Sequence, residues 1–310
     1  MESEPRLLQK TLKTGVRLVF IYVIIALLGS ALLGQLLPFL PSEAASILGA
    51  LLGTAIVWKL GDPEKGTLFQ SQHRMTGTGF VVLLGAFMLA KLLSLVPSAI
   101  LLNLSVAESS TEALQSFASP NGSMLLSFLN MGICTAFCEE IVFRGCIGNR
   151  FRKYGVWFGM MMSTLLFSLY HGNLFQLVST FLPGIVLFYT AMNYSIKWSM
   201  LLHFFNNAIL SLGFLALKDA FPEVLLTQYG EYLLEAVLVI AALALLKKDH
   251  AVQKVKDFLR APENEPGVYK AAMGNLWFVL LILLNLVLTG MTLLMLRGDI
   301  PLDPDLGAGM

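Results

Sequence analysis

Charged side chains and cysteines are both scarce in this sequence. Asp, Glu, Lys and Arg make up only 13% of the 310 residues, about half the share usual in soluble domains. This deficit excludes two ordinary soluble domains, which the length alone would allow. A formal net charge of +1, with no basic cluster away from the apolar runs, argues against nucleic-acid binding. A disulfide-rich secreted module is excluded because the chain has only three cysteines in one apolar stretch: Cys134, Cys138 and Cys146.

Apolar residues fill most of the chain. They account for 56% of it, and the mean hydropathy is +0.73. A helix needs roughly 20 apolar residues to cross a bilayer. We therefore predict an all-α fold, a polytopic transmembrane helical bundle of about eight to nine spans, with eight if one short run is re-entrant. The runs are 16–40, 42–60, 78–96, 123–147, 155–171, 174–193, 198–217, 229–246 and 273–296.

Basic residues alternate between the loops. Of the 21 Lys and Arg residues, 18 lie before the first run, in every second loop, or in the ends of the runs that adjoin these segments. Lys and Arg are enriched in cytoplasmic loops, so we expect the N-terminus in the cytoplasm and, with nine spans, the C-terminus outside. Lys91 and Glu235 lie within runs, and we expect their charged ends to extend to the interface.

The segment 247–260 combines lysines with apolar residues at helical spacing. Ala251, Val255, Phe258 and Leu259 follow an i, i+4, i+7, i+8 pattern. This pattern is typical of a basic amphipathic helix lying on the inner leaflet of a membrane. A charged, solvated connector is the alternative interpretation.

Polar and ionisable groups gather in three of the apolar runs. An ionised side chain at the bilayer centre costs about 2.5–3.5 kcal/mol on insertion scales, and such groups usually line a cavity. The fourth, fifth and seventh runs therefore hold the candidate site residues: Glu139, Glu140, Arg144, His171, His203 and Asn207.

The two glutamates are expected to have different roles. Arg144 follows Glu140 by four residues, so these side chains share a helix face and can form an ion pair. Glu139 points about 100° away. Burial would make its carboxylate a stronger base, suited to general base catalysis. The alternative is a cluster of charges at the inner interface.

Histidines provide the other candidate groups. His203 and Asn207 are four residues apart, so both can point at one atom, and such donors suit an oxyanion. The alternative is a polar contact between helices. His171 alone would more often be an interfacial or hydrogen-bonded core residue.

Three motifs in a fixed order resemble a known family. They are EExxxR at 139–144, FxxxH at 167–171 and HxxxN at 203–207. Together they resemble the CPBP family, which contains the CAAX prenyl endopeptidases and the bacteriocin-processing or immunity (Abi) proteins. The resemblance covers about residues 123–215.

The resemblance implies a catalytic group of Glu139, His171, His203 and Asn207. In it Glu139 is the catalytic carboxylate, His171 helps it to activate water, and His203 and Asn207 stabilise the oxyanion. Glu140 and Arg144 are supporting residues.

The sequence does not decide between a metal-dependent and a metal-free site. The family is often labelled metalloprotease, and zinc could be held by Glu139, His171 and His203 with a water as fourth ligand. The sequence has no HExxH motif. The same residues also work without a cofactor, as a glutamate base with oxyanion donors, which is the version we prefer.

Helices that run perpendicular to the membrane would not bring Glu139, His171 and His203 together. Glu139 and His203 would lie about 10–17 Å from the cytoplasmic face, but His171 about 27 Å from it, at 1.5 Å per residue. The fifth run must therefore be strongly tilted, begin with a surface segment, or return before crossing.

We therefore expect an intramembrane endopeptidase that cleaves a peptide or a membrane-associated protein tail. The alternatives are a membrane transporter or channel, and a non-catalytic bacteriocin-immunity protein on the same fold. The site is expected to open to the cytoplasm in a bacterial or archaeal plasma membrane, with the lipid bilayer and the substrate as partners. The expected division is N-terminal transmembrane helices (1–122), a catalytic helical core (123–217), and C-terminal transmembrane helices with the basic connector (218–310).

Overall fold

The computed structural model describes residues 4–61, 69, 73–105, 123–222, 224–260 and 264–296. Within these ranges every regular element is a helix, and no strand occurs. Seven described helices are long and apolar enough to cross a membrane. The chain is therefore an integral, multi-pass membrane protein with an all-helical fold, as the sequence predicts. The seven are Gln9–Leu36, Ser42–Gly61, Gly77–Ile100, Met124–Tyr154, Leu174–Asn193, Ile196–Ala220 and Leu276–Leu294.

Two predicted runs are not among these seven. The run 155–171 forms the helix α9 (Val156–Tyr170), which has only 15 residues. The run 229–246 forms α13 (Leu225–Leu245), which carries Glu231 and Glu235. Adding one or both of these helices to the seven gives the predicted count of eight to nine spans.

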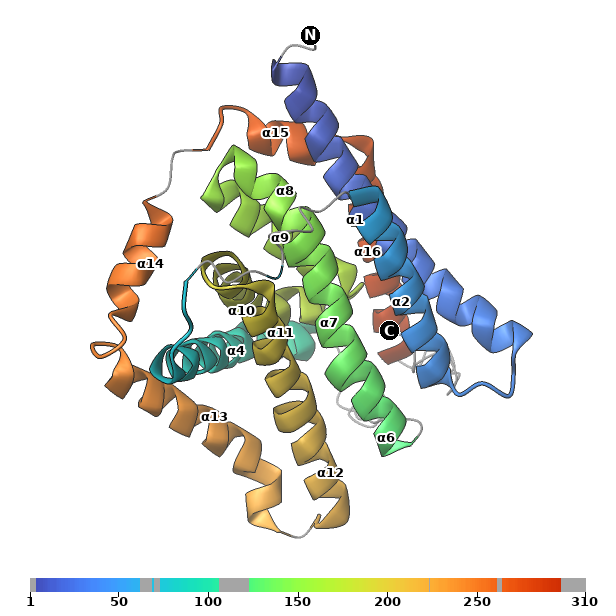
Figure 1. Cartoon of the computed structure of the whole chain (residues 1–310). Helices are drawn as coiled ribbons and strands as arrows, with labels where there is room; N and C mark the ends of the chain where they lie inside the picture. Colours follow the sequence, from blue (N-terminus) through green and yellow to red (C-terminus); the bar gives the residue numbers. More distant parts are fainter. Residues whose placement is uncertain are drawn as a thin grey trace.

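Helices from the two ends of the chain pack together (Figure 1). α1 (Glu4–Leu36) and α2 (Ser42–Gly61) lie side by side, and both α15 (Val268–Met273) and α16 (Leu276–Leu296) pack against α1. Their buried side chains join those of the central helices in one apolar core. This group therefore supports the central helices from one side.

Two long central helices carry most of the candidate site residues (Figure 1). The first runs without a break from α6 to α8, because every junction residue keeps right-handed helical backbone angles. The segments η2, η3 and η5 are π-helical, with wider turns than an α-helix, and such turns are frequent at functional sites. The first helix comprises α6 (Met124–Ser127), η2 (Phe128–Thr135), α7 (Ala136–Glu139), η3 (Glu140–Gly148) and α8 (Asn149–Phe151), and the second comprises α11 (Ile196–Phe204), η5 (Phe205–Leu212) and α12 (Gly213–Ala220).

Between the two central helices in sequence lies an antiparallel hairpin. After the short turn η4 (Arg152–Tyr154), α9 packs against α10 (Leu174–Asn193). The Thr180 hydroxyl donates to Ser168 Oγ at 3.0 Å. One helical turn further along, a Cβ added to Gly184 would lie 2.9 Å from Thr164 Cγ2, so only a small residue fits there.

The hairpin turn includes the candidate residue His171. It is followed by Gly172, which has a φ of 68° that L side chains rarely adopt, and by Asn173. The Asn173 side chain accepts a hydrogen bond from the Gln176 backbone N–H at 2.8 Å and so caps α10. Fifteen residues rise only about 22 Å, less than the ~30 Å hydrocarbon core. Of the three arrangements proposed for this run, the structure favours a helix that returns before crossing.

A charged cluster connects α13 to α4 (Gly77–Ser105). Lys91 Nζ lies 2.8 Å from Glu231 Oε1 and 2.6 Å from Glu235 Oε1, and Glu235 is fully buried. The expectation that Lys91 and Glu235 extend to the interface is therefore wrong. These opposite charges pair with one another across two packed helices instead.

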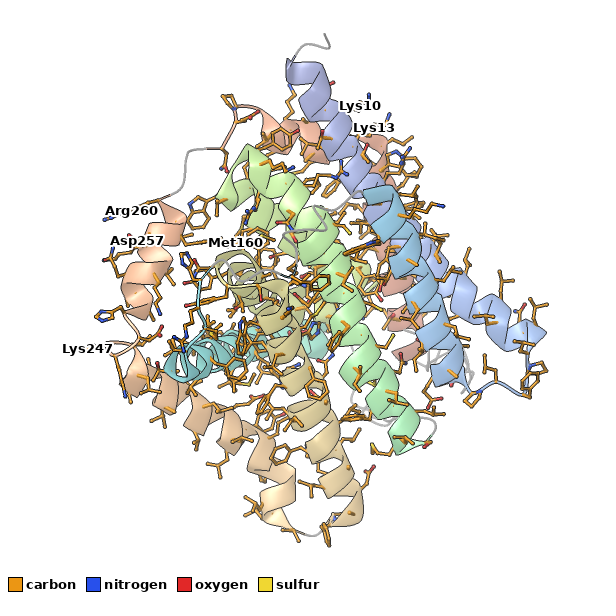
Figure 2. The ribbon with its side chains drawn as sticks, in the orientation of Figure 1. Lys10, Lys13, Met160, Lys247, Asp257 and Arg260 are labelled. Carbon is orange, nitrogen blue, oxygen red and sulfur yellow. The ribbon has the colours of Figure 1, made fainter. Side chains whose placement is uncertain are left out.

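The predicted basic amphipathic helix is present as α14 (Ala251–Leu259), which lies along one edge of the molecule (Figure 1). Phe258 and Leu259 pack against the buried Met160 and its neighbours, whereas Val252 and Val255 are exposed. Figure 2 shows Asp257 and Arg260 on the outer side of this helix, with Met160 toward the interior. Its contact with a membrane remains a prediction.

Candidate active site

Glu140 is surrounded by donors from two helices. Arg144 Nη1 donates to its Oε1 at 2.9 Å, as the four-residue spacing predicts. His203 Nδ1 lies 3.1 Å from the same oxygen, and the Ser199 hydroxyl donates to Oε2. A carboxylate with three donors in a fully buried position is held rigidly and has little capacity left for another partner.

Arg144 is fully buried and is also held from three directions. Besides the Glu140 ion pair, its Nη2 donates to the Gly184 carbonyl on α10 at 3.2 Å. Its guanidinium carbon lies 4.1 Å from the centre of the Phe167 ring on α9, a cation–π distance. Arg144 thus connects the first central helix to both arms of the hairpin.

Glu139 has a different environment from its neighbour. Its side chain is buried, and its Oε2 has no hydrogen-bond partner among the described residues. Nε2 of His203 lies 3.7 Å from this oxygen. A buried carboxylate oxygen without a partner is costly in a folded protein and calls for a functional explanation.

His203 lies between the two glutamates. Since an ionised carboxylate only accepts hydrogen bonds, His203 Nδ1 must carry the proton that Glu140 Oε1 accepts. This bond fixes the ring so that Nε2 faces Glu139. The two glutamates therefore contact opposite nitrogens of one imidazole.

His171 reaches the same region from the hairpin turn. Its Nδ1 is 2.9 Å from the Phe167 carbonyl, which only accepts, so the proton is on Nδ1 and Nε2 is left as the acceptor of the neutral ring. The Phe167 ring lies 4.9 Å from the His171 ring and 6.1 Å from the His203 ring, between centres. Both imidazoles thus pack around one phenyl ring.

Asn207 follows one turn after His203, in the π-helical η5. Its Nδ2 donates to the Met131 carbonyl on η2 at 3.0 Å. The two helices approach closely there because Gly132 faces Ala208, with a Cβ-to-Cβ distance of only 3.0 Å if Gly132 had a side chain. One amide N–H of Asn207 is thus used for anchoring, and the second remains for another acceptor.

The residues considered as zinc ligands do not form a metal site in this arrangement. Across the described ranges, no three His, Cys, Asp or Glu side chains are close enough together to hold one metal ion. Glu139 and His203 face each other, but His171 does not join them as a third ligand. The zinc alternative stays a prediction to be tested by experiment, and no step below is derived through a metal.

Two residues of this site were not singled out from the sequence. Ser199 precedes His203 by four residues, so the i, i+4 pattern of His203 and Asn207 extends back by one turn to include it. Phe167 is the first residue of the FxxxH motif, and its contacts with Arg144 and both histidines give that position a physical reason.

Comparison with known proteins agrees with the ordered motifs. Residues 121–209 match the family described as type II CAAX prenyl endopeptidase Rce1-like. No match is found among curated proteins or solved structures. The matched segment includes every candidate site residue, from Glu139 to Asn207. Residues 121–209 are therefore similar to the type II CAAX prenyl endopeptidase Rce1-like family, in agreement with the resemblance that the ordered motifs indicate.

Proposed function

We propose that this protein is an intramembrane endopeptidase that hydrolyses a peptide bond in a peptide or membrane-associated protein tail, with Glu139 as the general base. One observation carries the proposal. Of two adjacent buried glutamates, Glu140 has three donors, whereas Glu139 Oε2 has none and faces His203 Nε2 at 3.7 Å.

The separation of Glu139 and His203 suits one water molecule. Two hydrogen bonds of about 2.8 Å each span a gap of 3.7 Å when the water lies to one side of it. Glu139 takes a proton from this water, and the oxygen attacks the carbonyl carbon of the substrate. With both ring nitrogens of His203 protonated, its Nε2 donates to the water oxygen, and the two O–H groups of the water are donated to Glu139 and to the unprotonated Nε2 of His171.

The attack produces a tetrahedral oxyanion, which needs donors. The second N–H of Asn207 is one, since the first is bonded to the Met131 carbonyl and fixes the amide. His203 donates through Nε2 when both ring nitrogens are protonated. Glu139 then passes its proton to the leaving amine nitrogen, so that the products are one carboxylic acid and one amine.

The test is cleavage by purified protein. Detergent-solubilised wild type is incubated with peptide libraries, with and without a prenylated cysteine near the C-terminus, and products are identified by mass spectrometry. A defined cleavage position is expected, and separate incubations with zinc and with a chelator test the metal alternative. No cleavage of any library, together with solute transport in proteoliposomes, would support the transporter alternative instead.

A further inference from the structure

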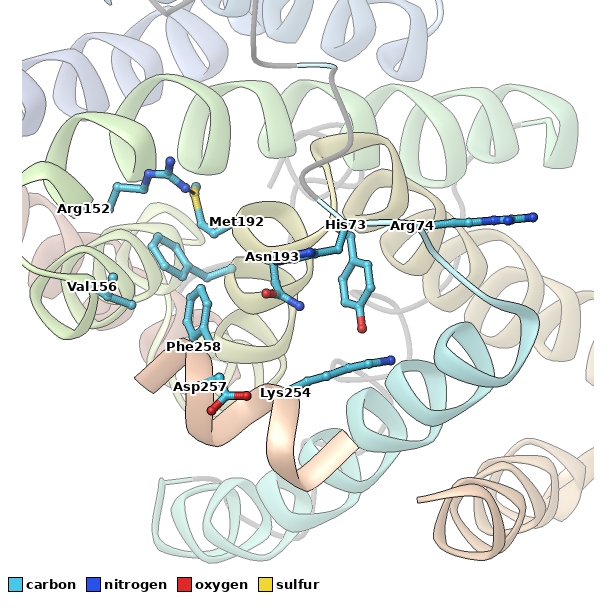
Figure 3. A pocket seen from close by; sticks show the side chains of 11 residues that line it. His73, Arg74, Arg152, Val156, Met192, Asn193, Lys254, Asp257 and Phe258 are labelled. Atoms are coloured by element: carbon cyan, nitrogen blue, oxygen red, sulfur yellow. Dashed lines mark hydrogen bonds between the residues drawn. The ribbon is translucent and has the colours of Figure 1, made fainter. Parts of the chain in front are cut away.

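A cavity lined by none of the catalytic residues lies between several helix ends (Figure 3). It has a volume of about 790 Å³ and is lined by residues from η4, the start of α9, the end of α10, the segment before α4, and α14. None of the six candidate catalytic or supporting residues lines it. The proposed endopeptidase chemistry therefore leaves this cavity without a role.

Two cations face this cavity from opposite sides. Arg152, in η4, is half-buried, and its Nη1 contacts Met192 Sδ at 3.3 Å. No carboxylate lies within 4 Å of its guanidinium among the described residues. Lys254, in α14, is oriented by Asp249, whose Oδ1 lies 2.8 Å from Nζ, and its side chain is about one-third exposed. In Figure 3 Arg152 and Lys254 flank Asn193, whose amide adds a polar group between them.

The acidic residues near the cavity do not cancel this charge. Asp249 pairs with Lys254, and Asp257, which also lines the cavity, lies 3.5 Å from Arg260. Arg152 is then the cation in excess. Arg74 lines the edge and adds positive charge, although its side chain extends away from the centre in Figure 3.

One wall of the cavity is apolar. Phe188 and Met192 of α10 are buried there, and Phe258 of α14 packs against them. On the same helix as Phe258, Val252 and Val255 are 55% and 38% exposed. The cavity also lies at the ends of helices, where the first central helix is followed by α9 and where α10 ends. A ligand with an anionic head and an apolar continuation fits this combination.

We propose that this cavity binds the phosphate-bearing headgroup of an anionic phospholipid. Arg152 and Lys254 donate to the phosphate oxygens, and the apolar wall contacts the glycerol and the first acyl carbons. Charge-assisted hydrogen bonds are roughly twice as strong as neutral ones, so two cations favour a headgroup with net negative charge. The Val252 and Val255 face of α14 then continues into the surrounding lipid.

The test counts lipids that remain bound to the full-length protein. Purified wild type in detergent is mixed with equal amounts of phosphatidylglycerol and phosphatidylcholine, and native mass spectrometry measures the bound fraction of each. Wild type is expected to prefer phosphatidylglycerol. Arg152→Gln and Lys254→Gln should each weaken its binding by about tenfold.

Lys256→Gln is the matched control, since Lys256 lies on the same helix but does not line the cavity. It should bind phosphatidylglycerol like wild type. Equal loss in the control, equal binding of both lipids, or unchanged binding in both test variants would overturn the proposal. Arg152 and Lys254 lie on different elements, so if one variant fails to fold, the other still tests the proposal.

A third arm identifies the source of the phosphate. Glycerol 3-phosphate is added at the lipid concentration, as a soluble ligand with the same anionic group. It should displace little phosphatidylglycerol, because it lacks the acyl carbons that contact Phe188 and Met192. Complete displacement would show a site for soluble phosphate esters, contrary to the proposal.

Discussion

At the residue scale, the adjacent residues Glu139 and Glu140 have side chains in different environments. The pairing of Glu140 with Arg144 could be predicted from spacing, and it is present at 2.9 Å. The second and third contacts of that cluster, from Ser199 and His203, depend on how a distant helix packs. Spacing within one helix holds no information on that packing, so only the local half of the cluster was predictable.

Removing one partner of the Glu140 cluster should destabilise the fold. Glu140→Gln leaves the buried Arg144 charge unpaired, and Arg144→Ala leaves Glu140 unpaired, each at a cost of about 3–5 kcal/mol. Both variants should give less folded protein and a lower thermal unfolding midpoint than Glu139→Gln. That substitution keeps the shape of the side chain, and Glu139 Oε2 has no hydrogen-bond partner among the described residues. Wild-type yield and stability for Glu140→Gln would contradict the supporting role.

Asn207 should matter in the transition state. If its free N–H stabilises the oxyanion, Asn207→Ala lowers kcat by roughly 10²–10³ while KM changes little. The measurement is steady-state peptide cleavage. A rise in KM at constant kcat would indicate ground-state binding, as in a transporter site.

At the element scale, the length of α9 and the pairing of Lys91 on α4 differ from what the apolar runs alone predict. The 15-residue α9 brings His171 to the same Phe167 ring as His203, which an upright full-length span would prevent. The sequence placed the end of this run at residue 171, where the turn lies, but it left open whether the run is tilted, begins at the surface or returns before crossing. For Lys91 and Glu235, the sequence showed two charges within apolar runs but not that α4 and α13 are neighbours.

The Lys91 cluster should contribute to the packing of α4 against α13. Lys91→Met leaves Glu231 and Glu235 without their cation, and an unpaired buried charge costs about 3–5 kcal/mol. The thermal unfolding midpoint should fall clearly, and adding Glu235→Gln should recover part of the loss.

Lys197→Met serves as the control for this cluster, since Lys197 is exposed and has no carboxylate within 4 Å among the described residues. Its unfolding midpoint should equal that of wild type. A Lys91→Met variant as stable as this control would show that the ion pairs contribute nothing to helix packing.

At the scale of the whole molecule, composition was sufficient for the fold class. An apolar share of 56% required most of the chain to be membrane helices, and all described elements are helical. The number of spans was less certain, because α9 and α13 fall outside the seven clear candidates. The hairpin of α9 and α10 begins and ends on one side, so whether it crosses does not alter the orientation of the helices that follow.

Orientation can be measured directly. The distribution of Lys and Arg predicts that reporter fusions at Thr67 and Glu265 lie in the cytoplasm and that fusions at Glu112 and Leu225 lie outside. A reporter pair active only on one side of the membrane provides the readout. Reversed signals at either pair of positions would contradict the predicted orientation and the cytoplasmic opening of the site.

The central claim is that Glu139 is the general base of peptide hydrolysis. The most direct test is the cleavage rate of purified Glu139→Gln beside wild type, with circular dichroism and thermal unfolding to compare the folds. The account predicts a loss of at least about 10²–10⁴ in kcat, with an unfolding midpoint close to that of wild type. Cleavage at the wild-type rate by a folded Glu139→Gln protein would contradict it.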